Sequence, residues 1–559
     1  MQISGAKMVL ESLKKEGVKT VFGYPGGAIM NVYDEIYKQK EIKHILSRHE
    51  QASVHSAEGY AKITGEVGVA IVTSGPGFTN AVTGLANAFT DSTPMVVISG
   101  QVPMSLIGTD GFQEIDAVGI SRACTKHNYL VTDAKDLPRI FKEAFHIARS
   151  GRPGPVHIDI PKDVTAQITE FEYPNFVDIP TYKPVTKSDI ESIKLAVDAI
   201  RDSKRPLLYI GGGIVNSNSS GLVRQIAEST GIPAVETLMA RGVMGVENPL
   251  LISMLGMHGS YAANIAMSET DLVISLGARF DDRVTGKLSE FAKNAKVIHI
   301  DIDPSSINKL VDVDFPIIGD LNFVLSDMLP LLTEIDSSKY SDWRDTVSKN
   351  DDLHPLGYEK LDGILKPQEI VEKIGEMLGD NANISTDVGQ HQMWAAQFYP
   401  FSRARQFNSS GGLGTMGYGF PAAMGVKVGN PERVSINITG DGSILMNIQE
   451  LMTAVEYKIP VINVILNNNY LGMVRQWQTL FYDNRISETD LSTQPDFVKV
   501  AESFGGIGYK VKTMEEFENA LKDAVEKNIV AIIDVQVFRD ENVMPMVPAG
   551  ASLYNMMLK

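Results

Sequence analysis

The sequence predicts an α/β protein in which three doubly wound domains each contain a parallel sheet. The chain has 559 residues, which is too long for one hydrophobic core and allows three or four domains of ordinary size. Short apolar strands alternate with helical stretches in three successive blocks, the pattern of parallel sheets. Several of these strands end in glycine-rich turns, at the sheet edge where ligands bind in such folds.

The composition is typical of a globular protein and disfavours two classes of partner. Hydrophobic residues make up 43% of the chain, and 51 basic against 68 acidic side chains give a net charge of −17. This charge argues against non-specific binding to nucleic acid or to an anionic membrane. No apolar run approaches the ~18 residues of a membrane span, and residues 1–18 read as an amphipathic helix rather than a signal peptide. The single cysteine, Cys124, excludes an internal disulfide and suits the cytoplasm.

The first block spans residues 1–165. Its apolar strands in 67–77 and 93–102 both end in glycine-containing turns. The stretch 173–184, which contains proline and tyrosine, indicates a linker to the second block.

The second block spans residues 186–345. We expect strands within 205–215, 271–280 and 296–304, because each contains a short apolar run followed by glycine or aspartate. The polar segment 336–355 is expected to separate this block from the third.

The third block spans residues 365–540. Strands are predicted within 382–389, 433–440 and 460–469. The tail, 541–559, has no clear hydrophobic period, and we interpret it as a lid or a strap.

A lone carboxylate and a run of asparagines end two neighbouring strands of the third block. Asp441 stands between Gly440 and Gly442, and a helical face over 444–455 leads to the strand that ends before Asn468. This strand–helix–strand unit brings both side chains to one sheet edge. Their oxygens suit Mg²⁺ or Ca²⁺, and the glycines let backbone amides approach a phosphate. The pair predicts a metal-held diphosphate, although either motif alone is more often a plain turn or a solvated loop.

Two other motifs are ambiguous when taken alone. His49 and Glu50 begin a zinc-protease pattern, but Ser53 stands where the second histidine would be required, so a lone surface glutamate is the simpler interpretation. The glycine pattern 412–417 suggests a dinucleotide site, yet the preceding 403–410 is not a convincing buried strand.

The whole chain resembles the catalytic subunits of the acetohydroxyacid synthase (acetolactate synthase) family, which are thiamine diphosphate (ThDP) enzymes. GDG followed by an asparagine pair matches the ThDP signature. One small departure is Gly111, where alanine is expected. The resemblance rests on the strings at 23–30, 107–114, 125–131, 256–259, 277–286, 471–478 and 546–553.

The resemblance implies an activity and its cofactors. The enzyme would decarboxylate pyruvate on ThDP and condense the hydroxyethyl carbanion with pyruvate or 2-ketobutyrate, giving 2-acetolactate or 2-aceto-2-hydroxybutyrate in branched-chain amino acid biosynthesis. It would bind Mg²⁺, and FAD in the central domain without redox use; the string 279–286 favours this type over the flavin-free catabolic enzyme. A homodimer or dimer of dimers and a small regulatory subunit are also implied.

The resemblance also implies roles for single residues. Glu50 in the first, pyrimidine-binding domain would hydrogen-bond the aminopyrimidine ring, and Met416 would hold the cofactor bent. Arg283 would grip the acceptor's carboxylate, and Trp477 would contact its extra methylene. The catalytic set is Glu50, Gln113, Lys126, Arg283 and Trp477, and the metal set in the third, diphosphate-binding domain is Asp441, Asn468 and Tyr470. The cofactor-binding set is Pro25, Gly26, Pro76, Asn80, Arg152, Gly211, Gly212, Gly213, Thr237, Leu238, Met257, His258, Gly277, Arg279, Asp301, Ile302, Asp320, Val388, Gly389, Gln390, His391, Gly414, Met416, Gly440, Gly442, Ser443 and Met473.

Two alternatives remain at this stage. A flavin-dependent pyruvate oxidase, or another ThDP carboligase, shares the same cofactors. A binding protein with a dead site is the other class, and the presence of Glu50, Asp441 and Asn468 together argues against it. The sequence leaves open the preferred acceptor, the oligomeric state beyond a dimer, the metal and the sensitivity to feedback inhibitors.

Overall fold

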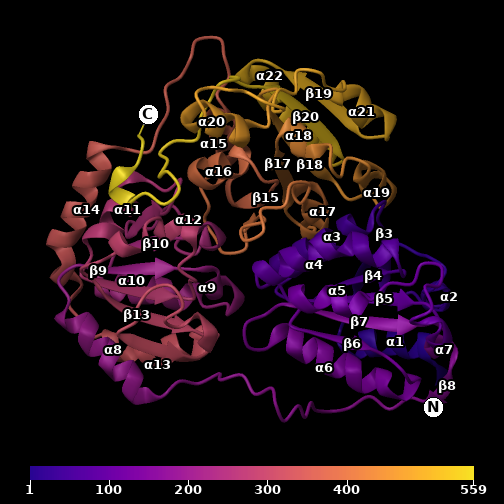
Figure 1. Cartoon of the computed structure of the whole chain (residues 1–559). Coiled ribbons are helices and arrows are strands. Elements are labelled where there is room, and N and C mark those ends of the chain that lie inside the picture. The colour runs from indigo at the N-terminus through magenta and orange to yellow at the C-terminus, as the bar shows by residue number, and fades with distance from the viewer. Residues whose placement is uncertain (559) are drawn as a thin grey trace.

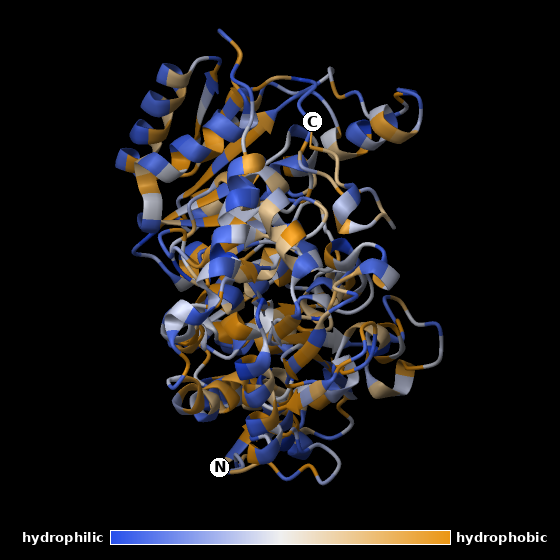
Figure 2. Ribbon diagram, turned by 90° about the vertical axis from the view of Figure 1, so that its left-hand side faces the viewer, coloured by the Kyte–Doolittle hydropathy of each residue, from blue (hydrophilic) through white to orange (hydrophobic). Residues whose placement is uncertain are grey.

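Three six-stranded sheets, all parallel, form the centres of three units in the computed structural model, which describes residues 1–558 (Figure 1). The first unit lies at the lower right of Figure 1, the middle unit at the left and the third at the top. Strands such as β5 (Met95–Gln101) and β18 (Val461–Asn467) are buried along their whole length, as expected for parallel strands covered on both faces. Figure 2 shows the apolar residues concentrated in the interior of the ribbon.

The first unit has the strand order β3-β2-β4-β5-β7-β6. The further strands are β2 (Thr20–Gly23), β3 (Lys43–Leu46), β4 (Gly68–Val72), β6 (His127–Leu130) and β7 (Pro155–Pro161). The helices are α1 (Gly5–Lys15), α2 (Met30–Tyr37), α3 (Glu50–Thr64), α4 (Pro76–Thr90), α5 (Ala117–Ser121), α6 (Leu137–Arg149) and α7 (Lys162–Ala166). A separate antiparallel pair, β1 (Gln2–Ser4) and β8 (Ile168–Glu170), precedes the extended linker.

The middle unit has the order β11-β10-β9-β12-β13-β14, so the chain switches direction across the sheet at β9. This order is the doubly wound arrangement that binds dinucleotides at its switch point. Its strands are β9 (Pro206–Ile210), β10 (Ala234–Glu236), β11 (Leu251–Met254), β12 (Leu272–Leu276), β13 (Lys296–Asp301) and β14 (Phe315–Ile318). Its helices are α8 (Ile190–Asp202), α9 (Gly212–Asn216), α10 (Ser220–Thr230), α11 (Tyr261–Glu269), α12 (Asp282–Thr285), α13 (Leu321–Leu332) and α14 (Ser341–Leu353).

Helix α14 differs from the expectation for this segment. The polar stretch 336–355 was expected only to separate two blocks, but most of it is a helix that packs on α11. Trp343 and Val347 are buried, and the indole of Trp343 donates to the carbonyl of Pro206 at 3.0 Å. Two apolar residues one helical turn apart are enough to attach an otherwise polar helix to the middle unit.

The third unit has the order β16-β15-β17-β18-β20-β19, which repeats the topology of the first unit. Its remaining strands are β15 (Ala382–Thr386), β16 (Phe407–Asn408), β17 (Val434–Thr439), β19 (Ile507–Val511) and β20 (Ala531–Gln536). Its helices are α15 (Pro367–Leu378), α16 (Gln390–Phe398), α17 (Gly419–Gly429), α18 (Asp441–Ile444), α19 (Glu450–Glu456), α20 (Gly472–Phe481), α21 (Phe497–Ser503) and α22 (Met514–Lys527).

Two local expectations for this unit are wrong. The segment before the glycine pattern does contain a buried strand, β16. A strand of only two residues is too short to show a hydrophobic period in the sequence. The helical face predicted over 444–455 is broken into α18 and α19. The break occurs where the Asn447 side chain turns to donate to the carbonyl of Gly417 at 2.7 Å, in the glycine-rich loop.

Two contacts fix how the units meet. Helix α3 of the first unit crosses α17 of the third so closely that a Cβ on Gly59 or Gly425 would collide with the other backbone, and Figure 1 shows the two helices side by side. The tail passes from the third unit to the middle unit, where the amide of Val547 donates to the carbonyl of Met257 at 2.8 Å. The tail is therefore a strap. No helix within residues 1–558 has the length and apolarity needed to cross a membrane.

Candidate active site

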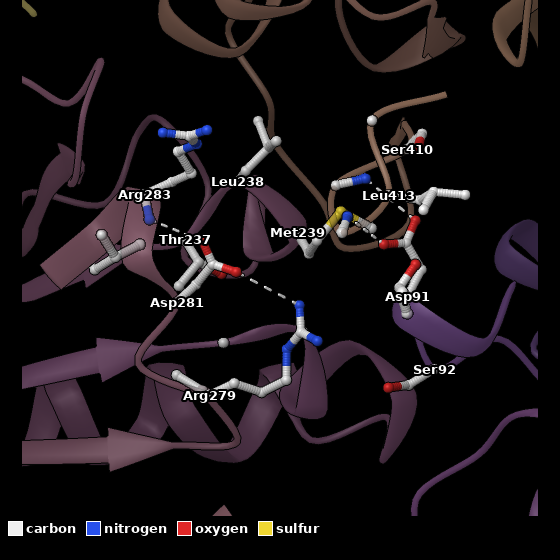
Figure 3. A pocket seen from close by; sticks show the side chains of 18 of the residues that line it. Asp91, Ser92, Thr237, Leu238, Met239, Arg279, Asp281, Arg283, Ser410 and Leu413 are labelled. Carbon is white, nitrogen blue, oxygen red and sulfur yellow. Dashed lines mark hydrogen bonds and ion pairs between the residues drawn. The ribbon is translucent and has the colours of Figure 1, made fainter. Parts of the chain in front are cut away.

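A cavity of about 1400 Å³ lies where the three units meet. It is larger than the pocket that a single small ligand usually occupies. Part of its wall is shown in Figure 3, where residues of all three units face one another. The residues expected from sequence that line it are Arg152, Gly211, Gly212, Gly213, Thr237, Leu238, Met257, His258, Gly277, Arg279, Arg283, Asp301, Ile302, Asp320, Val388, Gly389, Gly414, Met416, Met473 and Trp477.

One part of the cavity lies at the switch point of the middle sheet. Gly211 follows β9 and Gly277 follows β12, and the two backbones approach so closely that neither position has room for a Cβ. Gly277 has a φ of +63°, which side chains rarely adopt. Asp301 ends β13 at the same edge. Backbone amides, a short helix start and a carboxylate at this edge fit a dinucleotide such as FAD.

Another part of the cavity wall combines a guanidinium with apolar side chains. The Arg283 side chain is 60% exposed and has one distant carboxylate, Asp282, at 3.9 Å. Trp477 on α20 is half-buried and lies edge-on to Phe481, with ring centroids 5.4 Å apart. The tryptophan therefore does not fill a core but forms part of the cavity wall together with Met473.

The metal and diphosphate residues gather at the carboxyl ends of β15, β17 and β18. Asn467 donates to the side-chain oxygen of Gln494 at 2.8 Å, and Gln494 in turn donates to Asp441. Asn468 donates to Gln390 at 3.1 Å and accepts the amide of Tyr470 at 3.1 Å. Ser443, one turn beyond Gly440, donates to the carbonyl of Val388 at 3.3 Å and so links α18 to the end of β15. Two successive strand ends thus bring together the side chains that lie far apart in the sequence.

Two buried polar atoms in this cluster have no hydrogen-bond partner within residues 1–558. They are Asp441 Oδ1 and His391 Nε2. Burial raises the pKa of Asp441 to about 7 and lowers the pKa of His391 to about 3, so the imidazole is neutral. A hard cation on Asp441 and a phosphate oxygen near His391 would satisfy both atoms. No group of three or more His, Cys, Asp or Glu side chains in the described residues could hold a metal ion.

Glu50 and its neighbours form a separate cluster at the carboxyl edge of the first sheet. Glu50 begins α3 and accepts a hydrogen bond from Asn80 of α4 at 3.0 Å. A Cβ on Gly77 would lie 3.4 Å from Glu50, and one on Gly75 would meet Gln113 at 2.9–3.0 Å. Pro76 begins α4 between these glycines, while Pro25 and Gly26 follow β2 opposite Thr73.

Within one chain, the two halves of the expected ThDP site make no direct polar contact among the described residues. No hydrogen bond or ion pair among residues 1–558 joins the Glu50 cluster to Asp441 or Asn468. The Glu50 cluster does not line the cavity either. Large apolar side chains near both halves are exposed, with Phe112 at 90% and Met446 at 53%.

Lys126, expected to be catalytic, is placed elsewhere. Its ammonium donates to the carbonyls of Ile147 and Ser150 at the end of α6, and to the Tyr182 hydroxyl at 2.9 Å. Burial, with Arg152 nearby, lowers the pKa of Lys126 to about 7. All three donors are used, so in this chain Lys126 caps a helix and holds the linker.

Three further residues in the site were not identified from the sequence. Asp387 follows β15, is buried, and accepts the amide of Gly419 at 2.8 Å and the hydroxyl of Thr439 at 2.7 Å. Gln476 donates to and accepts from the backbone of Val543 in the strap, and Gln494 bridges Asn467 and Asp441. The sequence does contain a signal for Asp387, because, like Asp441, it is a carboxylate that follows a predicted strand. The two glutamines carried none.

Comparisons with known proteins agree with this arrangement. Three family models match: the N-terminal binding domain of thiamine pyrophosphate enzymes over residues 3–120, their central domain over 193–328 and their C-terminal binding domain over 387–535. The chain is 47% identical to the acetolactate synthase large subunit of Haemophilus influenzae, covering 100% of this chain and 98% of that protein. It is 45% identical to the acetolactate synthase isozyme 3 large subunit of Escherichia coli, with coverages of 100% and 98%. A probable acetolactate synthase large subunit of Methanocaldococcus jannaschii is 46% identical, with coverages of 99% and 95%.

Proposed function

Because this chain belongs to the acetolactate synthase large subunits of the thiamine pyrophosphate enzyme family, we propose that it joins a two-carbon unit from pyruvate to a second 2-keto acid. The products are 2-acetolactate with pyruvate as acceptor and 2-aceto-2-hydroxybutyrate with 2-ketobutyrate. When bound, ThDP supplies the carbon nucleophile. The residues of the chain bind the cofactor and the keto acids, orient them, and distinguish the two acceptors.

One observation carries this function. The cavity connects Arg283 and Trp477, a cation beside an apolar wall, to Gly389 and Met416 next to the diphosphate cluster. A small 2-keto acid has the same two features, a carboxylate and a short apolar chain. The acceptor therefore fits between the guanidinium and the indole, next to the place where the cofactor would react.

Asp441, Asn468 and Tyr470 are proposed to hold Mg²⁺ against the diphosphate. The partnerless Oδ1 of Asp441 supports this role, because an unpaired buried carboxylate oxygen is costly without a cation. A Cβ on Gly440 would lie 3.0 Å from His391, so the backbone beside the proposed diphosphate carries no side chain at this position.

FAD is proposed to bind the part of the cavity at the switch point of the middle sheet and to act as a structural element. The switch point of the middle sheet with its close-packed glycines supports a dinucleotide there. Arg152 of the first unit donates to Ser92 at 2.8 Å and contacts Asp303 of the middle unit at 3.5 Å. A ligand at this place would touch both units and hold them in register.

Each active site is proposed to lie between two chains, with Glu50 of one facing Asp441 of the other. The lack of a hydrogen bond or ion pair between the two clusters among residues 1–558 supports this arrangement, as do the exposed Phe112 and Met446 beside them. A homodimer, or a dimer of dimers, is then the working unit. In this unit Glu50 would hydrogen-bond the cofactor's aminopyrimidine ring. This contact would control the removal of the C2 proton of ThDP. Glu50→Gln should therefore slow C2 proton exchange more than it weakens ThDP binding.

A small regulatory subunit is proposed as a further partner, because the relatives from Haemophilus influenzae and Escherichia coli are named large subunits. Co-purification with a candidate small protein, together with a rise in activity, would establish the pair.

A product assay tests the proposed activity. The purified chain with ThDP, Mg²⁺ and FAD should form acetolactate from pyruvate alone, and the six-carbon product when 2-ketobutyrate is added. Consumption of oxygen or a quinone in proportion to pyruvate, with acetate as product, or acetyl phosphate when inorganic phosphate is present, would instead identify a pyruvate oxidase.

A further inference from the structure

The glycine-rich loop 409–417, which carries Met416, is held by hydrogen bonds from the first unit as well as from its own unit. The loop joins β16 to α17 of the third unit, and residues 411–414 are exposed. Met416 is half-buried and lines the cavity. A loop with this many glycines has little conformational preference of its own, so contacts from outside must fix where Met416 lies.

Asp91 of the first unit binds the backbone at the tip of this loop. Its carboxylate accepts the amide of Gly412 at 2.7 Å and the amide of Gly411 at 3.2 Å, and Figure 3 shows it pointing to the loop between Ser410 and Leu413. A Cβ on Gly412 would lie 2.8 Å from Thr90 and 3.0 Å from Asp91, so the approach requires glycine.

A buried cation holds the Asp91 carboxylate in place. Lys62 on α3 lies 2.8 Å from Asp91 and 3.0 Å from the fully buried Glu58, and it also donates to the carbonyl of Ser409 at 2.7 Å. Burial alone would lower the pKa of Lys62, but the carboxylates of Asp91 and Glu58 raise it well above its usual value. The cluster is therefore charged, and charge-assisted hydrogen bonds to the loop are stronger than neutral ones.

Asn87 binds the base of the same loop. Its side-chain oxygen accepts the hydroxyl of Ser410 at 2.5 Å and the hydroxyl of Thr415 at 2.8 Å. Its amide donates to both oxygens of Glu58 at 2.9 Å, which fixes the orientation of the amide. Thr415 directly precedes Met416, so this contact acts on the residue next to the one that lines the cavity.

We propose that Asp91 and Asn87 are positioning residues for the reaction, which set the place of Met416 against the cofactor through hydrogen bonds to the loop 409–417. This proposal rests on the proposed function, because it concerns the geometry of bound ThDP. Neither side chain needs to touch the cofactor. A displacement of the loop by about an ångström would move Met416 relative to the bound cofactor, and small misplacements of this kind strongly reduce rates.

The test compares Asp91→Asn with a matched control. Asp271 is also an aspartate that accepts two backbone amides, those of Lys204 at 2.9 Å and Arg205 at 3.0 Å, but it lies at the end of β9 that is remote from Gly211. Three quantities are measured for the parent chain, Asp91→Asn and Asp271→Asn: the melting temperature, the ThDP affinity, and the rate at which bound ThDP exchanges its C2 proton in D₂O.

We expect Asp91→Asn to bind ThDP as the parent does but to exchange the C2 proton about tenfold to about a hundredfold more slowly. Asp271→Asn should lower the melting temperature and leave the exchange rate of bound ThDP unchanged. Thr415→Val, which removes one hydroxyl at nearly constant volume, should slow exchange to a smaller extent, and it serves as the test if Asp91→Asn does not fold.

Parental exchange rates in both Asp91→Asn and Thr415→Val would overturn the proposal. So would a loss of ThDP affinity in proportion to lost stability, because a purely structural contact predicts that result. If the parent chain itself binds no ThDP, the proposed function has failed rather than the role of the loop.

Discussion

Two inactive variants of this chain should restore activity when they are mixed. Glu50→Gln removes the carboxylate at the start of α3, and Asp441→Ala removes the carboxylate after β17. The structure shows these groups in different clusters of one chain, with no hydrogen bond or ion pair among the described residues between them. If each site combines Glu50 of one chain with Asp441 of the other, a hybrid dimer has one site with both groups intact and one with neither.

The expected recovery of activity follows from the fraction of hybrid dimers in the mixture. Random exchange of equal amounts gives hybrids as about half of all dimers, and each hybrid has one working site of two, so activity should recover to about a quarter of the parent's. Each variant assayed alone should remain close to zero. The assay is acetolactate formation after the two chains are unfolded together, refolded and sized by sedimentation.

A second mixture gives the opposite result and serves as the control. The double variant Glu50→Gln/Asp441→Ala, added in excess to the parent chain, should abolish activity, because a hybrid of these two has no site with both groups. If sites lay within single chains, the first mixture would stay inactive and the second would keep the parent's activity. Either outcome, or a fully active monomer, would refute the intersubunit site.

Four other changes have defined outcomes. Trp477→Leu should lower the preference for 2-ketobutyrate over pyruvate by between about fivefold and about a hundredfold, since a methylene contact is worth roughly 1–3 kcal/mol, and an unchanged product ratio in a competition assay would contradict this. Arg283→Lys should weaken both acceptors alike in the same assay, because lysine lacks the planar fork. A flavin that cannot be oxidised or reduced, but keeps its shape, should support the parental rate, and strict dependence on flavin redox state would point to an oxidase. Without Mg²⁺, the pKa of Asp441 is raised to about 7 from its usual 3.8, so folding is favoured while this carboxyl is protonated. As pH rises from about 4 to about 7, the folded chain should therefore lose on the order of 4 kcal/mol of stability. Asp441→Asn should remove that dependence in thermal melts at pH 5 and 8.

The sequence by itself determined the architecture and the chemistry of the strand ends. Apolar runs that end in glycine or aspartate predict parallel strands with a ligand edge, and all three six-stranded sheets are parallel. Asp441 and Asn468 could be paired from sequence because one strand–helix–strand unit separates them, and such a unit has only one geometry. Even there, the interruption of the helix between α18 and α19 depended on a contact of Asn447 with a distant loop and could not be read from periodicity.

Only the tertiary structure decided which distant residues meet. Lys126 resembles a catalytic residue in sequence, but the end of α6 and Tyr182 take up its donors. Asp91 and Asn87 have no local feature in the sequence that indicates a role. Their hydrogen bonds reach a loop more than 300 positions later in the chain. Hydrophobic period and turn chemistry depend only on neighbouring residues, so they can be recognised in the sequence whatever the tertiary packing is. Contacts between units depend instead on how closely α3 and α17 can approach, and that distance is set by glycines whose role is visible only when both helices are in place.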